Sequence, residues 1–292
     1  MNILSIQSEV VYGHVGQGAA RFALQRLGHE VWAVPTVILS SHAGYPRVEG
    51  EAVSPDLMRR LIAGLDANGW LKHCDAILSG YLGSAEQADV VGEAVRRVKA
   101  ANPQSLYCLD PVFGDEGRAY AKHGVAEAMA RTLLPLADIV TPNAFELSSL
   151  TSVAISDVSD ALIAAKRLGR PLVVATSIPA GPDRIGALAV DKDAAWFAST
   201  PRLENAPHGA GDLFAALILA ARLRGDGLDV ALKRATTATF HVLNESVSAS
   251  SAEMLLIKAL TIPMDGLDSS DIVAVVGATR ETPSHIPPPP VR

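Results

Sequence analysis

A glycine-rich turn in this sequence ends in an acidic residue directly before a long apolar run. Gly209, Ala210 and Gly211 precede Asp212, and the apolar run 213–221 follows at once. Glycines on either side of a small residue let backbone N–H groups converge, and the unpaired amides of a helix that starts there add to an anion-binding pocket. An aspartate in the first turn of that helix can accept the proton of an alcohol that attacks phosphorus. The spacing indicates a phosphoryl-transfer centre that uses ATP.

The same turn also has a purely structural interpretation. A Gly-x-Gly-Asp sequence can be a loop in which Asp212 caps the predicted helix 213–223. The other glycine-rich segment, residues 12–16, lacks both Gly-x-Gly-x-x-Gly and Gly-Lys-Ser/Thr, so we reject a Rossmann or P-loop site. The choice between capping and catalysis at Asp212 therefore depends on the other polar positions.

Three acidic or amide side chains follow apolar runs elsewhere in the chain. Asp110 precedes Pro111, which keeps Asp110 out of the helical region, so it either orients magnesium-bound water and phosphate or ends a strand in a turn. Asn143 and Glu146 have the spacing of a helix capping box. They could equally lie beside a triphosphate, with Glu146 acting through magnesium-bound water. The two roles of this pair are compatible.

Other polar and aromatic residues follow the strands nearer the N-terminus. His42 and Tyr81 could pack against a flat ring, although a lone His or Tyr after a strand is more often structural. Ser8 has the same ambiguity, because serine is an ordinary loop residue. These positions suggest an acceptor pocket only in combination.

The elements that must hold these residues alternate between strands and helices. Short apolar runs predict strands at 2–6, 30–37, 76–79, 106–109, 139–140 and 172–175. Helical periodicity predicts helices at 18–27, 55–65, 85–100 and 159–168. This alternation predicts an α/β fold with a mostly parallel sheet covered on both faces. Ligands of such sheets gather beyond the carboxyl ends of the strands, where the polar residues above are expected.

Composition narrows the range of partners and locations. A chain of 292 residues with a net charge of -6 and scattered basic residues suits one domain that binds a small molecule rather than nucleic acid or an anionic membrane. Its two cysteines form no metal or disulfide pattern, which fits a cytoplasmic location. We expect neither a signal peptide nor a membrane span. Residues 1–277 should form one domain, followed by a disordered Pro-rich tail at 278–292.

Taken together, the motifs resemble the pyridoxal kinases of the ribokinase-like superfamily, and the resemblance runs in order from Asn2 to about Leu243. The motifs are Ser5-Ile6-Gln7-Ser8, Tyr12-Gly13-His14-Val15-Gly16, Ser41-His42-x-Gly44-Tyr45, Ser79-Gly80-Tyr81, Asp110-Pro111-Val112, Thr141-Pro142-Asn143-x-x-Glu146 and Gly209-Ala210-Gly211-Asp212. The resemblance implies a ribokinase-like three-layer α/β/α sandwich. It also implies ATP-dependent phosphorylation of the 5'-hydroxyl of pyridoxal in vitamin B6 salvage, with pyridoxine and pyridoxamine as further candidate substrates.

The resemblance also implies roles for individual residues. Asp212 is then the general base, and Gly209, Ala210 and Gly211 form the anion hole. The ATP side comprises Asp110, Asp115, Thr141, Asn143, Glu146, Thr176 and Ser177, with Asp110 and Glu146 toward Mg²⁺ and Asp115 in a mobile loop over the nucleotide. The pyridine side comprises Ser8, Val15, His42, Ala43, Gly44 and Tyr81. A homodimer and a monovalent cation such as K⁺ are further implications.

Four positions depart from the family pattern. Ala43 stands where the family usually has a threonine near the substrate, and Glu9 stands where it commonly has histidine. Gln17 replaces a usual asparagine and Ala210 a frequent threonine. The loss of a hydroxyl at Ala43 bears most directly on which vitamer is preferred. Two alternatives therefore stay open, a hydroxymethylpyrimidine kinase and a pyridoxal-binding protein without catalysis.

Overall fold

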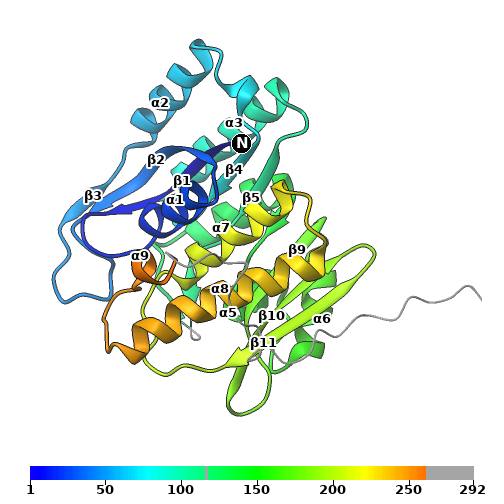
Figure 1. Cartoon of the computed structure of the whole chain (residues 1–292). Coiled ribbons are helices and arrows are strands. Elements are labelled where there is room, and N and C mark those ends of the chain that lie inside the picture. Colours follow the sequence, from blue (N-terminus) through cyan, green and yellow to red (C-terminus); the bar gives the residue numbers. More distant parts are fainter. Residues whose placement is uncertain (116–117, 261–292) are drawn as a thin grey trace, which may run out of the picture.

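A sheet lies at the centre of the molecule, with helices on both of its faces (Figure 1). The structure is a computed structural model that describes residues 1–115 and 118–260. Within these residues the sheet has nine strands in the order β11-β10-β9-β8-β5-β4-β1-β2-β3. The predicted three-layer α/β/α sandwich is confirmed. The predicted domain end at residue 277 and the predicted tail 278–292 lie outside the described residues.

The six predicted strands form the parallel centre of the sheet. They are β1 (Asn2–Val10), β2 (Glu30–Leu39), β4 (Ala76–Ser79), β5 (Leu106–Leu109), β8 (Ile139–Val140) and β9 (Leu172–Pro179). Each pairs in parallel with its neighbours in this group. Ile3 and Leu4, which point to opposite faces of β1, are both fully buried. Burial on both faces explains why these strands read as continuous apolar runs.

Three antiparallel strands extend the sheet at its edges and were missed by the sequence analysis. They are β3 (Gly50–Ala52), which pairs with β2, and the hairpin β10 (Arg184–Asp191) and β11 (Ala195–Pro201), which continues from β9. A hairpin of this kind has no helix between its strands, so a search for alternating strands and helices passes over it. The sheet is therefore mostly parallel with antiparallel edges.

Helices cover the two faces in two groups. One face carries α1 (Gln17–Arg26), α7 (Ala210–Leu223), α8 (Leu228–Ser248) and α9 (Leu256–Ala259). The other carries α2 (Pro55–Ala67), α3 (Glu86–Ala101), α4 (Val125–Ala128), α5 (Ala144–Thr151) and α6 (Val158–Leu168), with single turns at Leu71–His73, Met129–Leu133 and Leu134–Leu136. All nine residues of the apolar run 213–221 are buried, because α7 packs between the sheet, α1 and α8. An apolar surface all round the helix suits this central position.

The strands β1, β2 and β9 run further than the sequence analysis expected, and the longer β1 and β9 correct the placement of three site residues. Ser8 lies inside β1, and Thr176 and Ser177 lie inside β9, rather than in loops after these strands. Both positions coincide with irregular pairing. The register between β1 and β2 shifts around Ser8, and the register between β9 and β10 shifts opposite Thr176 and Ser177. A bulge re-aims side chains that a regular strand would point into the core.

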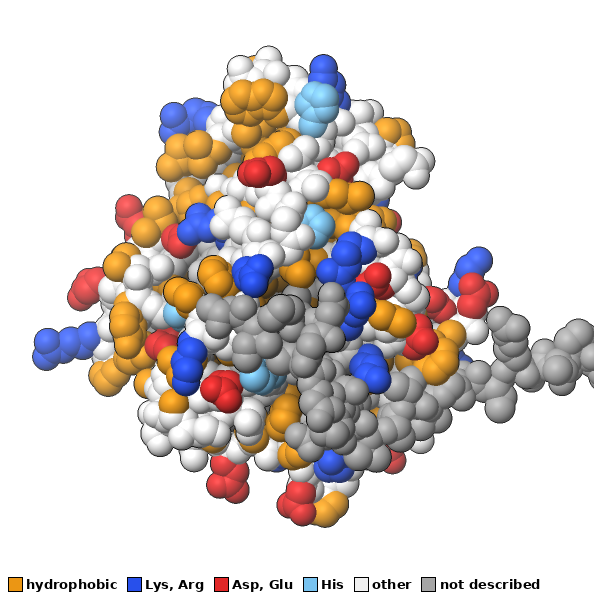
Figure 2. Space-filling view, in the orientation of Figure 1, with side chains coloured by type: hydrophobic (Ala, Val, Ile, Leu, Met, Phe, Trp, Pro, Cys, Tyr) orange, Lys and Arg blue, Asp and Glu red, His pale blue; other side chains and the backbone are white. Residues whose placement is uncertain are grey.

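Basic and acidic side chains are interspersed over the face shown in Figure 2. No helix among residues 1–115 and 118–260 combines the length and apolarity needed to cross a membrane.

Candidate active site

The glycine-rich turn forms the N-terminus of α7, as the sequence predicted. Gly209 is the residue before the helix and adopts a left-handed conformation with a φ of 100°. No side chain caps this end of α7. The N–H groups of the first turn therefore have no partner within the helix and can bind an anion, which the helix dipole also favours.

Asp212 lies in that first turn, and its side chain is partly exposed. Burial raises the pKa of Asp212 to about 6, while a hydrogen bond from the Gly16 backbone N–H opposes the rise. This contact also joins the loop after β1 to the start of α7. A carboxylate whose pKa lies near neutrality and whose surface is accessible is suited to accept a proton.

Asp110, which directly follows β5, lies close enough to Asp212 for their charges to interact. Asp110 is buried, and its Oδ1 accepts a hydrogen bond of 2.7 Å from Thr141 Oγ1. Burial raises the pKa of Asp110 to about 8, the charge of Asp212 contributes to the rise, and the Thr141 hydrogen bond opposes it. Oδ2 of Asp110 has no hydrogen-bond partner among the described residues. A buried carboxylate oxygen without a partner fits contact with a cation or its water.

Glu146 forms the predicted capping box with Asn143 at the start of α5. Asn143 N–H donates to Glu146 Oε2 at 2.9 Å, and Glu146 N–H donates to Asn143 Oδ1 at 2.9 Å. The other carboxylate oxygen accepts from the backbone N–H groups of Phe113 and Gly114, at 3.1 and 3.4 Å. Burial, followed by the charge of Asp110, raises the pKa of Glu146 well above its ordinary value. Glu146 therefore also holds the segment that leads from Asp110 into the next hairpin.

The remaining residues assigned to the ATP side differ in how they contact this cluster. Asn143 Nδ2 donates to the Gly114 carbonyl at 2.7 Å, and Asn143 forms a bridge with Thr176. Ser177 takes a left-handed φ of 58° at the irregularity in β9. Asp115 is exposed in β6 (Gly114–Asp115), which pairs with β7 (Arg118–Ala119). The structure thus joins Asn143, Thr176 and the base of the hairpin.

No group of three or more His, Cys, Asp or Glu side chains within residues 1–115 and 118–260 is arranged to hold a metal ion. Both oxygens of Glu146 already accept backbone hydrogen bonds. Of the two residues assigned to the metal, Asp110 is therefore the one with an oxygen left over. This arrangement suits Mg²⁺, which keeps most of its waters and usually reaches the protein through one or two carboxylates.

The loop between β1 and α1 packs against the glycine-rich turn and against Ser8. A Cβ on Gly209 would overlap the backbone oxygen of His14, and a Cβ on Gly16 would overlap Ser8. Gly16 has a φ of 53°, and Ser8 is 8 % exposed. Val15, which lies between His14 and Gly16 in the sequence, is partly buried. The two glycines allow this loop to approach both Ser8 and the start of α7.

The residues assigned to the pyridine side come from the end of β1, which contains Ser8, and from three loops beyond the strands. The His42 side chain, which follows β2, is only 13% exposed, and its Nδ1 accepts from the Gly44 N–H at 3.1 Å, while Ala43 and Gly44 are exposed. The ring of His42 lies 4.6 Å from that of His208, centroid to centroid. Tyr81 follows β4, and its carbonyl accepts from Thr36 Oγ1 at 2.7 Å. The His42 loop is thus in contact with the residue that precedes the glycine-rich turn.

Three residues of this region were missed by the sequence analysis. Tyr120 is 49% exposed but lies in the field of the carboxylates: partial burial raises its pKa, and the charges of Glu146, Asp212, Asp110 and Asp115 each raise it further. His208 contacts His42, and Glu253 accepts hydrogen bonds from the His14 and His42 loops. Tyr120 directly follows the short strand β7 and His208 directly precedes Gly209, but no local pattern at these positions or at Glu253 predicts the contacts that they make.

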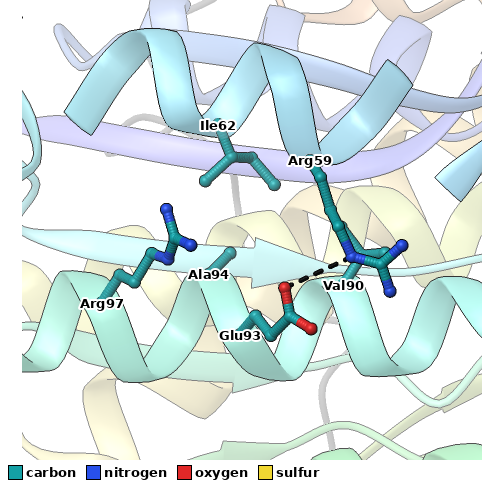
Figure 3. A pocket seen from close by; sticks show the side chains of 6 residues that line it. All are labelled: Arg59, Ile62, Val90, Glu93, Ala94 and Arg97. Atoms are coloured by element: carbon teal, nitrogen blue, oxygen red, sulfur yellow. Dashed lines mark hydrogen bonds and ion pairs between the residues drawn. The ribbon is translucent and has the colours of Figure 1, made fainter. Parts of the chain in front are cut away.

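A separate shallow pocket lies between α2 and α3 (Figure 3). It is lined by Arg59, Ile62, Val90, Glu93, Ala94 and Arg97. Arg59 Nε and Glu93 Oε2 form an exposed ion pair at 3.4 Å across it. None of its residues belongs to the carboxylate cluster or to the glycine-rich turn. An exposed ion pair of this kind contributes little to folding stability.

Comparisons with known proteins agree on one relationship. The family model for phosphomethylpyrimidine kinase matches residues 63–255. The pyridoxal kinase PdxY of Rubrobacter xylanophilus is 43% identical over 267 residues, which cover 89% of this chain and 92% of that protein. Its counterpart in Corynebacterium diphtheriae is 41% identical over 266 residues, covering 89% and 94%.

Solved structures show the same similarity in three dimensions. The pyridoxal kinase from Leishmania donovani in complex with ADP and ginkgotoxin is 31% identical with a TM-score of 0.88, covering 95% of this chain and 99% of that chain. The pyridoxal kinase from Entamoeba histolytica is 28% identical with a TM-score of 0.87, at 95% and 99% coverage. The similarity therefore extends over nearly the whole length of both chains.

Proposed function

Because the chain belongs to the pyridoxal kinase family and has the ribokinase-like fold, we propose that this kinase transfers the γ-phosphoryl group of ATP to the 5'-hydroxyl of pyridoxal. Pyridoxine and pyridoxamine are further candidate acceptors, since structures of the Leishmania donovani relative contain ADP with each of them. The observation that carries the proposal is the position of Asp212 at the uncapped start of α7, beside Asp110. The product, pyridoxal 5'-phosphate, suits a role in vitamin B6 salvage.

In the proposed reaction the chain supplies a base and an anion hole. Asp212 takes the proton of the 5'-hydroxyl while that oxygen attacks phosphorus. The N–H groups of the Gly209, Ala210 and Gly211 turn face the charge on the transferred phosphoryl group. The Gly16 N–H keeps the Asp212 carboxylate in place. Attack and proton transfer then require the hydroxyl to lie within hydrogen-bond distance of Asp212, roughly 3 Å.

On the ATP side we propose that Asp110 and Glu146 serve Mg²⁺. The ion, when bound with ATP, neutralises charge on the phosphates. The unpartnered Oδ2 of Asp110 is available to it or to its water, and Glu146 acts through water because its oxygens are already engaged. Thr141, Asn143, Thr176, Ser177 and Asp115 complete the proposed nucleotide side. A monovalent cation such as K⁺, the homodimer and the cytoplasmic location stay predictions.

On the acceptor side we propose that Ser8, Val15, His42, Ala43, Gly44 and Tyr81 surround the pyridine ring. Support comes from the contacts that join their loops to the start of α7, namely Gly16 with Asp212 and His42 with His208. Ala43 provides no hydroxyl to the ring. Preference among the vitamers should then depend more on the shape of the pocket than on a hydrogen bond from this position.

A substrate panel tests the proposed function and its nearest alternative. The purified protein with ATP and Mg²⁺ should convert pyridoxal to pyridoxal 5'-phosphate, monitored by absorbance, and omission of Mg²⁺ should abolish turnover. Hydroxymethylpyrimidine belongs in the same panel, because the matching family model is named for a pyrimidine kinase. Exclusive turnover of hydroxymethylpyrimidine would establish that alternative. Binding of pyridoxal without turnover of any acceptor would identify a binding protein.

The pKa of Asp212 predicts how the rate depends on pH. Burial raises this pKa to about 6, and the base must be ionised to accept a proton. The kcat/KM for pyridoxal should therefore be level above this value and fall about tenfold per pH unit below it. A pH–rate profile of the wild type checks this. The low-pH limb should be missing in Asp212→Asn, and an unchanged limb in that variant would assign the titration to another group.

A further inference from the structure

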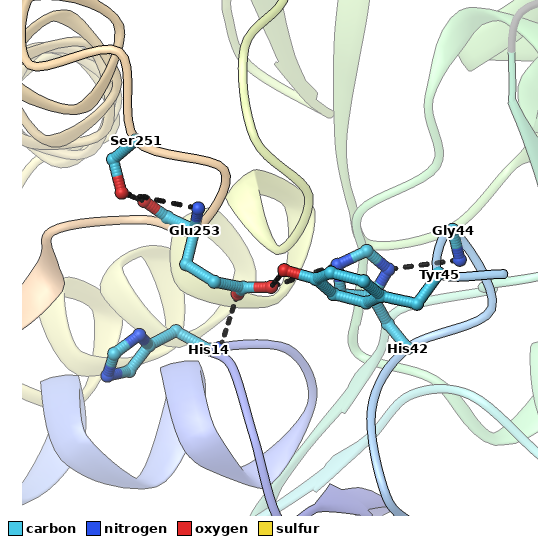
Figure 4. A network of polar contacts seen from close by, with 6 residues as sticks. All are labelled: His14, His42, Gly44, Tyr45, Ser251 and Glu253. Carbon is cyan, nitrogen blue, oxygen red and sulfur yellow. Dashed lines mark hydrogen bonds and ion pairs between the residues drawn. The ribbon is translucent and has the colours of Figure 1, made fainter. Parts of the chain in front are cut away.

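Glu253 lies in the segment between α8 and α9, yet its carboxylate is inserted between loops from the other end of the chain (Figure 4). Oε1 accepts hydrogen bonds from Tyr45 Oη at 2.7 Å and from His42 Nε2 at 3.1 Å. Oε2 accepts from the His14 backbone N–H at 3.1 Å. The Glu253 side chain is only 10% exposed. Three donors around one buried carboxylate make a specific set of contacts rather than a surface ion pair.

The contacts also define which nitrogen of His42 carries the proton. Gly44 N–H donates to His42 Nδ1, so in the neutral ring the proton is on Nε2 and points at Glu253. Burial lowers the pKa of His42, the charge of His208 acts in the same direction, and Glu253 opposes both. The contacts orient the ring as well as holding its loop.

Glu253 is itself held firmly. Ser251 Oγ donates to the Glu253 carbonyl at 2.7 Å and accepts from the Glu253 N–H at 3.3 Å. Gly13 has a φ of 105°, which favours glycine, and a Cβ added there would lie 2.5 Å from Glu253 Oε2, so a side chain at this position would displace the carboxylate. A carboxylate with a fixed main chain can fix the groups that donate to it.

The loops held by Glu253 are also those that contact the glycine-rich turn. The His14 carbonyl packs against Gly209. Met254, the residue after Glu253, also lies there, because a Cβ added to Gly209 would be 2.7 Å from the Met254 methyl group. The His42 ring contacts His208, directly before Gly209. Glu253 thus connects the His14 and His42 loops at the same point where both meet the start of α7.

We infer that Glu253 is a positioning residue for the acceptor substrate, which holds the His42–Tyr45 loop and the His14 loop against the glycine-rich turn through its three hydrogen bonds. This inference rests on the proposed function. Ala43 and Gly44 at the tip of the loop are exposed, and both inward side-chain hydrogen bonds of the loop, from His42 and Tyr45, go to one oxygen of Glu253. No contact of Glu253 reaches Asp110, Asn143 or Glu146 among the described hydrogen bonds. Loss of Glu253 should therefore affect the acceptor and spare ATP.

The test compares KM for pyridoxal and KM for ATP between Glu253→Gln and the wild type, under conditions in which both proteins are folded. In glutamine an NH₂ group, which is a donor, replaces one of the two carboxylate oxygens. Either the His14 N–H or the donors of His42 and Tyr45 then lose their acceptor. KM for pyridoxal should rise about tenfold or more, because buried donors lose their partner, while KM for ATP stays within about twofold. Tyr45→Phe, which removes one donor, should raise KM for pyridoxal less, and its effect should not add to that of Glu253→Gln. Glu253→Asp should recover part of the loss.

A matched control is Glu245→Gln, because Glu245 lies near the end of α8 and pairs only at the surface with Lys258 at 3.6 Å. Both KM values should stay at the wild-type level in this variant. An unchanged KM for pyridoxal in Glu253→Gln, or equal rises for pyridoxal and ATP, would overturn the inference. Should Glu253→Gln fail to fold, Tyr45→Phe applies the same comparison.

Failure of the proposed function has a different signature. A wild type that turns over no B6 vitamer overturns that proposal, and calorimetric titration with pyridoxal then tests the inference by itself. A weaker Kd for pyridoxal in Glu253→Gln than in the wild type supports the inference. Equal values, or no binding by the wild type, overturn it.

Discussion

Asp212→Asn is expected to lower kcat for pyridoxal phosphorylation by roughly two orders of magnitude or more, as loss of a general base does. The asparagine side chain keeps the size of the aspartate and an oxygen that can accept the Gly16 N–H. It cannot accept the proton of the attacking hydroxyl. Affinity for ATP and pyridoxal should change little, because Asp212 is assigned to the reacting proton rather than to the bulk of either ligand. Steady-state kinetics together with calorimetric Kd values separate the two quantities.

Asp229→Asn is the matched control for this variant, because Asp229 occupies the first turn of the neighbouring helix α8 and is exposed. Its kcat should equal that of the wild type. A kcat for Asp212→Asn within a few-fold of the wild type would reject Asp212 as the base. Asp110, whose pKa is raised by the charge of Asp212, would then be the next candidate.

Gly209→Ala should reduce kcat on the order of a hundredfold, the scale that accompanies loss of an oxyanion donor. The φ of 100° at Gly209 is unfavourable for any side chain, and the added Cβ would overlap the His14 carbonyl oxygen and crowd Met254. Since backbone must move to relieve this overlap, the first-turn N–H groups would lose their alignment. The strained conformation should also lower the free energy of unfolding by about 1–3 kcal/mol. Kinetics and chemical denaturation measure the two effects.

Gly225→Ala separates backbone strain from damage to the site. Gly225, just after α7, also has a positive φ, of 81°, but nothing lies within 4 Å of its added Cβ. This control should lose stability through strain and retain the wild-type kcat. If Gly209→Ala retained its kcat as well, the turn would not be the anion hole.

The local signals of this chain are strong at the centre of the sheet and at the start of α7. Buried parallel strands are continuous apolar runs, and Gly-Ala-Gly-Asp before an apolar run indicates the start of a helix, so both elements could be predicted from the local sequence. The turn alone did not decide between capping and catalysis at Asp212. The capping box of Asn143 and Glu146 was predictable for the same reason, because its two residues are three positions apart. The ends of β1 and β9 could not be predicted from the local sequence, because the bulges at Ser8 and Thr176 depend on pairing with another strand.

What the sequence determined by itself is the set of groups that can do chemistry: the turn, Asp212, Asp110 and the polar residues after the strands. Only the tertiary structure decided how they meet. Packing placed the Gly16 N–H on Asp212, left one oxygen of Asp110 unpartnered, and brought Glu253 to His42 across 211 positions of sequence. Contacts of this range follow from how helices and loops pack on the sheet, and a residue such as Glu253 carries no local pattern that would announce it.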